Sequence, residues 1–195
     1  RYLGYLTYYN KMELDEILSI DFNKHSIWNT HMQKLDEVSS FSELRKMMYL
    51  DLNTFTPSLN LNYTDKMSSA ASVEVRVPFL DHRLIEKAYT FPDEFFIKNF
   101  HQKYILKKIA QRELPNEIIW RKKAGFGAPV GSWINNSMKS IVQDYLSEES
   151  INRRGIFNSS FVQKLLKDNF DGRAYNANQI WQLLNFEIWY RNFFE

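Results

Sequence analysis

Asp51 is an acidic residue within an otherwise apolar stripe of a predicted helix. Leu44, Met48, Asp51 and Phe55 follow the spacing i, i+4, i+7 and i+11, which places them on one helical face. Burying a carboxylate without a partner is costly. We therefore expect Asp51 to be paired, to bind a metal or to line a cavity, and the pattern favours a structural ion pair and a functional role equally.

A second group of candidate residues lies in the segment 64–81, which reads TDKMSSAASVEVRVPFLD. Small residues fill positions 68–72 and would let a ligand or another backbone approach closely. Glu74 and Arg76 alternate with three valines, so both should point to the same face of an extended segment. An internal ion pair is the simpler interpretation. The alternative is that the segment frames a pocket for a carboxylate or a phosphate.

A third group lies in the segment 120–133, which reads WRKKAGFGAPVGSW. Three consecutive cations are followed by three glycines: Arg121, Lys122 and Lys123, then Gly125, Gly127 and Gly131. Glycines let a backbone close around an anion, and adjacent cations supply positive charge where negative charge develops. The spacing matches neither a Walker A loop nor a Rossmann fingerprint. A solvated basic turn is the simpler alternative.

The spacing of apolar residues predicts mostly helices as the elements that position these candidate residues. Ser42 is expected to cap a helix that ends at Pro57. Thr64 is expected to cap a short helix that runs through Ala71, and Asp81 is expected to cap a helix over 84–89. Further helices are predicted at 103–112, 138–146, 159–166 and 178–194, the last apolar nearly all round and therefore buried. Alternation suitable for several strands is missing, so the predicted class is mainly α, in one domain.

Composition excludes several kinds of site. The formal net charge of +2 and the lack of a long basic run give no argument for nucleic acid. Cysteine is absent, which excludes disulfides, thiolate metal sites and a cysteine nucleophile in these residues. The four histidines show no metal-ligand spacing, so no metal site is predicted. No apolar run is long enough to cross a bilayer, and we expect a cytoplasmic protein without a membrane partner.

Taken in order, the segments between about 41 and 133 resemble the asparagine synthetase family. The similar pieces are Tyr49-Leu-Asp51, Asp65-Lys-Met-Ser68, the run VEVRVPFLD at 73–81, Lys103-x-x-Leu106-Lys107, Leu114-Pro115, the run RKKAGF at 121–126, Pro129 and Trp133. The resemblance implies the helical C-terminal portion of an α/β ATP-pyrophosphatase-type (adenine nucleotide α-hydrolase-like) synthetase domain.

The resemblance also implies a reaction, that of a glutamine-hydrolysing carbon–nitrogen ligase. In the family, ATP activates the side-chain carboxylate of aspartate, which gives an aspartyl-adenylate and pyrophosphate. Ammonia from glutamine then displaces AMP and forms asparagine. The implied partners are aspartate, that ammonia, a glutaminase domain and the rest of the synthetase, with a homodimer of the full-length enzyme as one option.

The resemblance carries roles over to individual residues. Lys123 matches the lysine that neutralises charge at the transferring phosphate, and Asp51 matches an acidic residue that lines the synthetase pocket; both are candidate catalytic residues. Three further matches form the implied phosphate loop: Arg121, Gly125 and Phe126. Another three are implied to support the site structurally: Glu74, Arg76 and Asp81.

Two parts of the family pattern do not occur in these residues. The Ser-Gly-Gly-x-Asp-Ser loop that grips pyrophosphate is missing, and so is the cysteine of the glutaminase domain. The chain begins at Arg1-Tyr2, which matches the end of a Gly-Tyr-x-Arg-Tyr run of the family. We therefore expect residues 1–195 to be a partial domain that is inactive alone, with ATP and Mg²⁺ held mainly by the missing part.

Two alternatives remain open at this point. One is a related amidotransferase or cyclising synthetase that uses the same adenylation on another carboxylate. The other is a non-catalytic helical interaction fragment, which the aromatic tail at 180–194 would favour.

Overall fold

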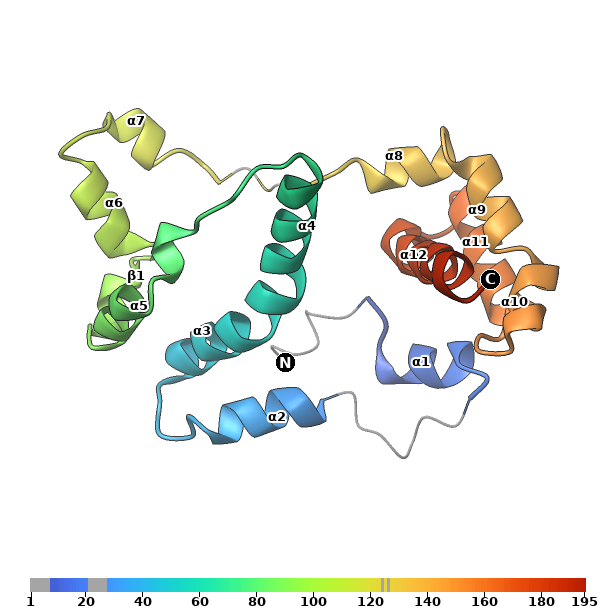
Figure 1. Cartoon of the computed structure of the whole chain (residues 1–195), viewed down its shortest axis with the longest axis horizontal. Helices are drawn as coiled ribbons and strands as arrows, with labels where there is room; N and C mark the ends of the chain where they lie inside the picture. The colour runs from blue at the N-terminus through green and yellow to red at the C-terminus, as the bar shows by residue number, and fades with distance from the viewer. Residues whose placement is uncertain (1–7, 21–27, 124, 126) are drawn as a thin grey trace. The chain divides into compact units, whose positions relative to one another are not determined.

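The computed structural model describes residues 8–20, 28–123, 125 and 127–195. They belong to two compact units, a central unit over 27–124 and a terminal unit formed by 1–26 and 125–195. A single domain over 1–195 stays a prediction. The described residues are mostly helical, which confirms the mainly α class (Figure 1).

The central unit is a succession of helices with one short hairpin. Its elements are α2 (Asn29–Asp36), α3 (Glu43–Asn53), a π-helical turn (Thr56–Leu61), α4 (Asn62–Ala70), a 3-10 turn (Pro78–Leu80), α5 (His82–Tyr89), a second 3-10 turn (Asp93–Phe95), β1 (Ile97–Lys98), β2 (His101–Gln102), α6 (Tyr104–Ala110) and α7 (Asn116–Ile119). The two strands pair antiparallel, with Ile97 opposite Gln102 and Lys98 opposite His101.

The start of α3 confirms the predicted cap, whereas its predicted end is wrong. The Ser42 hydroxyl accepts a hydrogen bond from the Arg45 amide at 3.4 Å. Helix α3 stops at Asn53, and Pro57 does not end the helical path, because it lies at the beginning of the π-helical turn where no amide hydrogen is needed. The chain continues directly into α4 (Figure 1).

The cap predicted at Thr64 is also wrong, because this residue lies inside α4, which has already begun at Asn62. The predicted end of this helix is confirmed, with Ala71 as its C-cap. Asp81 caps α5 as expected, since its carboxylate accepts a hydrogen bond from the Arg83 amide at 2.9 Å.

The terminal unit packs its helices around α11 and α12. Its elements are α1 (Lys11–Ile17), α8 (Val130–Asn135), α9 (Lys139–Tyr145), α10 (Glu148–Arg154), α11 (Ser159–Phe170) and α12 (Ala177–Phe194). The core includes Ile134, Val142, Leu166 and Leu184, contributed by four of these helices. Helix α12 is buried along its first part, as predicted, but Phe193 and Phe194 near its end are exposed.

The helices predicted by periodicity are all present, as α5, α6, α9, α11 and α12. Periodicity missed α1, α2, α7, α8 and α10, each of which has only four to eight residues. Length alone does not explain the difference, since the predicted helices α5, α6 and α9 also have only seven or eight residues. Among the described helices, none has the length and apolar character that a bilayer crossing requires.

Candidate functional site

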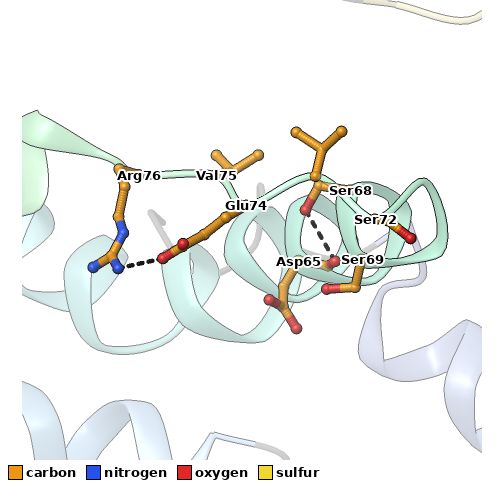
Figure 2. Close-up of a pocket in the computed structure, with 8 residues that line it drawn as sticks. Asp65, Ser68, Ser69, Ser72, Glu74, Val75 and Arg76 are labelled. Atoms are coloured by element: carbon orange, nitrogen blue, oxygen red, sulfur yellow. Dashed lines mark hydrogen bonds and ion pairs between the residues drawn. The ribbon is translucent and has the colours of Figure 1, made fainter.

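The end of α4 and the chain after it form a hollow of about 490 Å³ in the central unit (Figure 2). It is lined by Asp65, Ser68, Ser69, Ser72, Val73, Glu74, Val75 and Arg76. Apart from Ser68, which is half-buried, these residues are exposed, so the hollow is open to solvent. Hydroxyl, carboxylate and guanidinium groups from one short stretch of chain line the hollow, so it can bind ligands of either charge.

The serines of the hollow are presented by a Schellman ending of α4. The Val73 amide donates to the Ser68 carbonyl at 2.9 Å, and the Ser72 amide donates to the Ser69 carbonyl at 2.9 Å. This ending requires a left-handed residue, and Ser72 takes that place with a φ of 56°. Glycine is the usual residue there because it has no Cβ to clash. The chain therefore keeps a hydroxyl at a position where a side chain is strained.

Glu74 and Arg76 form the ion pair expected from their alternation with valines, and Figure 2 shows the two side chains meeting beside the hollow. Their side chains are 71% and 86% exposed. An exposed pair of this kind adds little stability. Its charges remain accessible, so both the structural and the ligand-binding interpretations of this segment stay open.

Asp81 lies at the start of α5, after the 3-10 turn of Pro78–Leu80. Its carboxylate pairs with the Arg83 guanidinium at 2.7 Å in addition to capping the helix. These hydrogen bonds, first from the side chain and then from the backbone of Arg83, lower the pKa of Asp81 from 3.8 to about 2. The geometry therefore places Asp81 in a local, structural role at the end of the RVPFLD run.

Asp51 lies half-buried on α3. Burial is the main cause that raises the pKa of the neighbouring Tyr89, and the negative charge of Asp51 adds a smaller part. The Tyr89 hydroxyl is buried and has no hydrogen-bond partner among the described residues. Sequence reasoning missed Tyr89, because nothing in its local pattern distinguishes it from a core tyrosine of α5.

The cationic run extends beyond α7 without regular structure. Arg121, Lys122 and Lys123 are exposed, and no hydrogen bond or ion pair within the described part of the chain involves their side chains. Gly125 is exposed as well, and a Cβ at this position would meet no atom within 4 Å. Phe126, the remaining residue of the predicted phosphate loop, lies outside the described residues.

The predicted glycine loop is shorter than expected at its C-terminal end. Gly131 and Trp133 lie inside α8, so they do not belong to a loop. A Cβ on Gly131 would lie 2.8 Å from the Tyr175 hydroxyl, so the glycine makes room for that ring.

The predicted site residues fall into groups that no described contact joins. The ion pair brings Glu74 and Arg76 together at the hollow, whereas Asp81 pairs locally with Arg83. Asp51 and Lys123 belong to the same unit, but among the residues described no hydrogen bond or ion pair links them. Their catalytic roles stay predictions.

A metal centre finds no support in the described ranges. No group of three or more histidine, aspartate or glutamate side chains lies close enough there to hold an ion. The carboxylates of the hollow are Asp65 and Glu74, and the second is already paired with Arg76. These residues therefore do not fit a Mg²⁺ site by themselves, and we assign no Mg²⁺ ligand to them.

Comparison with known proteins identifies relatives for most of the chain. The family described as Asparagine synthase matches residues 4–191. The asparagine synthetase [glutamine-hydrolyzing] 1 of Bacillus subtilis (strain 168) is 37% identical over 154 residues, which are 79% of this chain and 24% of that protein. The chain thus spans about a quarter of the length of this relative.

Two further relatives match a smaller part of the chain. The asparagine synthetase [glutamine-hydrolyzing] 3 of Bacillus subtilis (strain 168) is 42% identical over 82 residues, 42% of this chain and 13% of that protein. The asparagine synthetase [glutamine-hydrolyzing] of Gallus gallus is 39% identical over 88 residues, 44% of this chain and 16% of that protein. No solved structure gives a significant match.

Proposed function

Because the chain belongs to the asparagine synthase family, we propose that it forms part of the synthetase region of a glutamine-dependent asparagine synthetase. The match over residues 4–191 and the 37% identity to a Bacillus subtilis synthetase support this proposal. Under this proposal, the two helical units belong to an α/β ATP-pyrophosphatase-type domain. ATP, when bound, supplies the activation of a carboxylate that ammonia then converts to an amide.

The hollow beside α4 is the observation that carries the choice of acceptor. Asp65 can accept hydrogen bonds from an α-ammonium group, while Arg76 can donate to a carboxylate. The hydroxyls of Ser69 and Ser72 can donate to further oxygens. Groups of both signs within one hollow suit a zwitterion better than a simple anion, so we assign the hollow to an amino acid and, in this family, to aspartate.

Lys123 is assigned to the charge that develops when the acceptor carboxylate attacks a phosphate. Its ammonium is exposed and has no described ion pair, so it is available to an anionic ligand. A cation that is already in place stabilises such charge more strongly than solvent can. Asp51 is assigned to the wall of the synthetase pocket, as the family resemblance implies; it is not one of the residues that line the hollow beside α4.

The acceptor assignment is tested by steady-state kinetics of the complete synthetase that carries these residues. Asp65→Asn should raise the KM for aspartate roughly tenfold, since a charged hydrogen bond to the substrate is lost, and should leave the KM for ATP unchanged. Asp36→Asn, an exposed acid near the end of α2, is the matched control.

The identity of the product decides between the acceptors. With labelled glutamine, the enzyme should place the label in asparagine when aspartate is supplied. Amidation or cyclisation of another carboxylate, with aspartate unreactive, would contradict the assignment and favour a related synthetase. A complete enzyme that releases no pyrophosphate with any acceptor would favour a non-catalytic role.

A further inference from the structure

Trp120 lies at the point where α7 ends and the cationic run begins. Its amide donates to the Asn116 carbonyl at 2.9 Å and closes the helix. Arg121 to Lys123 follow directly, without regular structure. Trp120 is half-buried and is not among the candidate site residues.

The Trp120 ring is held by three side chains from the neighbouring hairpin and helix. The Lys107 ammonium lies 5.0 Å from the ring centroid, and the Lys108 ammonium lies 6.0 Å from it. The His101 ring meets Trp120 edge-on, with 5.0 Å between the centroids. Cations over an indole face are attracted by its quadrupole, and tryptophan is the strongest of the aromatic rings in this respect. Trp120 is thereby fixed against α6 and β2.

The backbone of α7 is tied to the same helix. The Gln111 side-chain amide donates to the Asn116 side-chain oxygen at 2.7 Å, which joins the end of α6 to the start of α7. Lys108 also lies 5.8 Å from the Tyr104 ring, so it bridges two aromatic faces of the unit. The short helix α7 is therefore anchored at both ends, and its second anchor is the Trp120 ring.

The distance from this anchor to Lys123 is short. Three residues span at most roughly 10 Å of extended chain, so the Trp120 backbone limits where the Lys123 backbone can lie. Within the described ranges, no side-chain hydrogen bond or ion pair holds Arg121, Lys122 or Lys123. The ring contacts of Trp120 are the nearest side-chain restraint on the N-terminal side of the run.

We propose that Trp120, held between Lys107, Lys108 and His101, is a positioning residue for Lys123. The proposal rests on the proposed function, since it assumes that the Lys123 ammonium meets developing negative charge. A positioned cation loses little freedom when the charge develops, whereas a cation on a free loop must be ordered first. Lys107 and Lys108 take part in no ion pair among the described residues, so they also add positive potential next to the run.

The test is a double-mutant cycle in the complete synthetase, followed by aspartate-dependent pyrophosphate release. Trp120→Leu should lower kcat roughly 10- to 100-fold, as expected when a reacting group is displaced by about 1 Å, with the KM for aspartate unchanged. Trp120→Phe should lose less, because it keeps an aromatic face. In a Lys123→Ala background, Trp120→Leu should cause no further loss, since the positioned group is already gone.

The controls separate this inference from a general loss of structure. Trp189→Leu removes an exposed indole of α12 and should leave kcat unchanged. If Trp120→Leu does not fold, Lys107→Met tests the same ring contact and should lower kcat in the parent enzyme but not in Lys123→Ala. Losses that multiply in the double variant, or a Trp120→Leu enzyme with full kcat, would overturn the inference. Full activity of Lys123→Ala itself would instead overturn the role of Lys123 in the proposed function.

Discussion

At the scale of the residue, Asp81 shows how a family motif can have a local structural role. Its carboxylate caps α5 through the Arg83 amide and pairs with the Arg83 guanidinium at 2.7 Å. Both interactions require the ionised form, which is why the pKa of Asp81 is lowered to about 2. The RVPFLD run thus ends in a residue that fixes the start of a helix, and the groups facing the hollow come from the residues before it.

The lowered pKa of Asp81 predicts a pH dependence of stability. A carboxyl whose folded pKa lies below its ordinary 3.8 contributes stability above that value and loses the contribution as the pH falls through about 2. Asp81→Ala should therefore be less stable than the parent near neutral pH, and the difference should shrink in acid. Urea unfolding at about pH 6 and about pH 3 measures it. A difference that stays constant over this range would contradict the prediction, and Asp15→Ala in α1 is the control.

The strained Ser72 predicts a stabilising substitution beside the hollow. Ser72→Gly should raise the free energy of unfolding by about 0.5–1 kcal/mol, because glycine adopts a positive φ without a steric cost. Ser69→Gly, in the last turn of α4, should do the opposite by about half a kcal/mol, since glycine has a lower helix propensity than serine. Thermal unfolding of the two variants should shift in opposite directions. A Ser72→Gly variant that is less stable than the parent would mean that the hydroxyl itself supports the fold.

At the scale of the element, the contact between α10 and α12 depends on a buried charge network. Glu187 is 1% exposed and accepts hydrogen bonds from Arg154 at 2.8 and 3.0 Å and from Arg191 at 3.0 Å. Both guanidinium groups stack on tyrosine rings, with 3.9 Å from Arg154 to Tyr190 and 3.9 Å from Arg191 to Tyr145. The network thus joins the two helices through groups that are all satisfied.

Removing one member of this network should destabilise the terminal unit strongly. Glu187→Ala should lower the free energy of unfolding by about 2–3 kcal/mol, because the buried Arg154 loses its main partner and keeps only Glu195, at 2.7 Å. Glu16→Ala, an exposed acid of α1, is the control and should change stability by less than about 0.5 kcal/mol. Chemical denaturation checks both variants, and a loss near that of the control would show that the network is not coupled to folding.

The same elements show how far sequence can predict this structure. The long helices α11 and α12 could be placed from sequence, α11 because its apolar face repeats over several turns and α12 because it is apolar nearly all round over 18 residues. The cap residues Ser42 and Asp81 could be named from their chemistry. The π-helical turn that begins at Thr56 and contains Pro57 could not be predicted, because such a turn depends on what packs around it and not on a local signal.

The candidate site was predicted in part for similar reasons. The alternation of Glu74 and Arg76 with valines fixes their common face, so their pairing follows from the sequence. The hydroxyl-lined hollow depends on the left-handed turn at Ser72, and serine gives no local sign of such a conformation. The contact of Glu187 with Arg154 joins positions 33 residues apart, which no short pattern contains.

At the scale of the whole molecule, the chain spans about a quarter of the length of its Bacillus subtilis relative. Its 195 residues contain no Ser-Gly-Gly-x-Asp-Ser loop, the family element that grips pyrophosphate. We predict that the purified 195-residue chain shows no aspartate-dependent pyrophosphate release, because its residues supply cations and hydroxyls but not that loop. A coupled pyrophosphate assay with ATP and aspartate measures this, and release above the level of a boiled sample would contradict the prediction.

The central claim is that Lys123 stabilises the charge that develops while ATP activates the acceptor carboxylate, and its most direct test compares two adjacent lysines in the complete synthetase. Both are exposed, and they differ only in their place along the run. Lys123→Ala should lower kcat for aspartate-dependent pyrophosphate release about 10²- to 10³-fold, the usual loss when a group that stabilises developing charge is removed. Lys122→Ala should retain kcat within about threefold. Equal losses in the two variants, or an unchanged kcat in Lys123→Ala, would contradict the account.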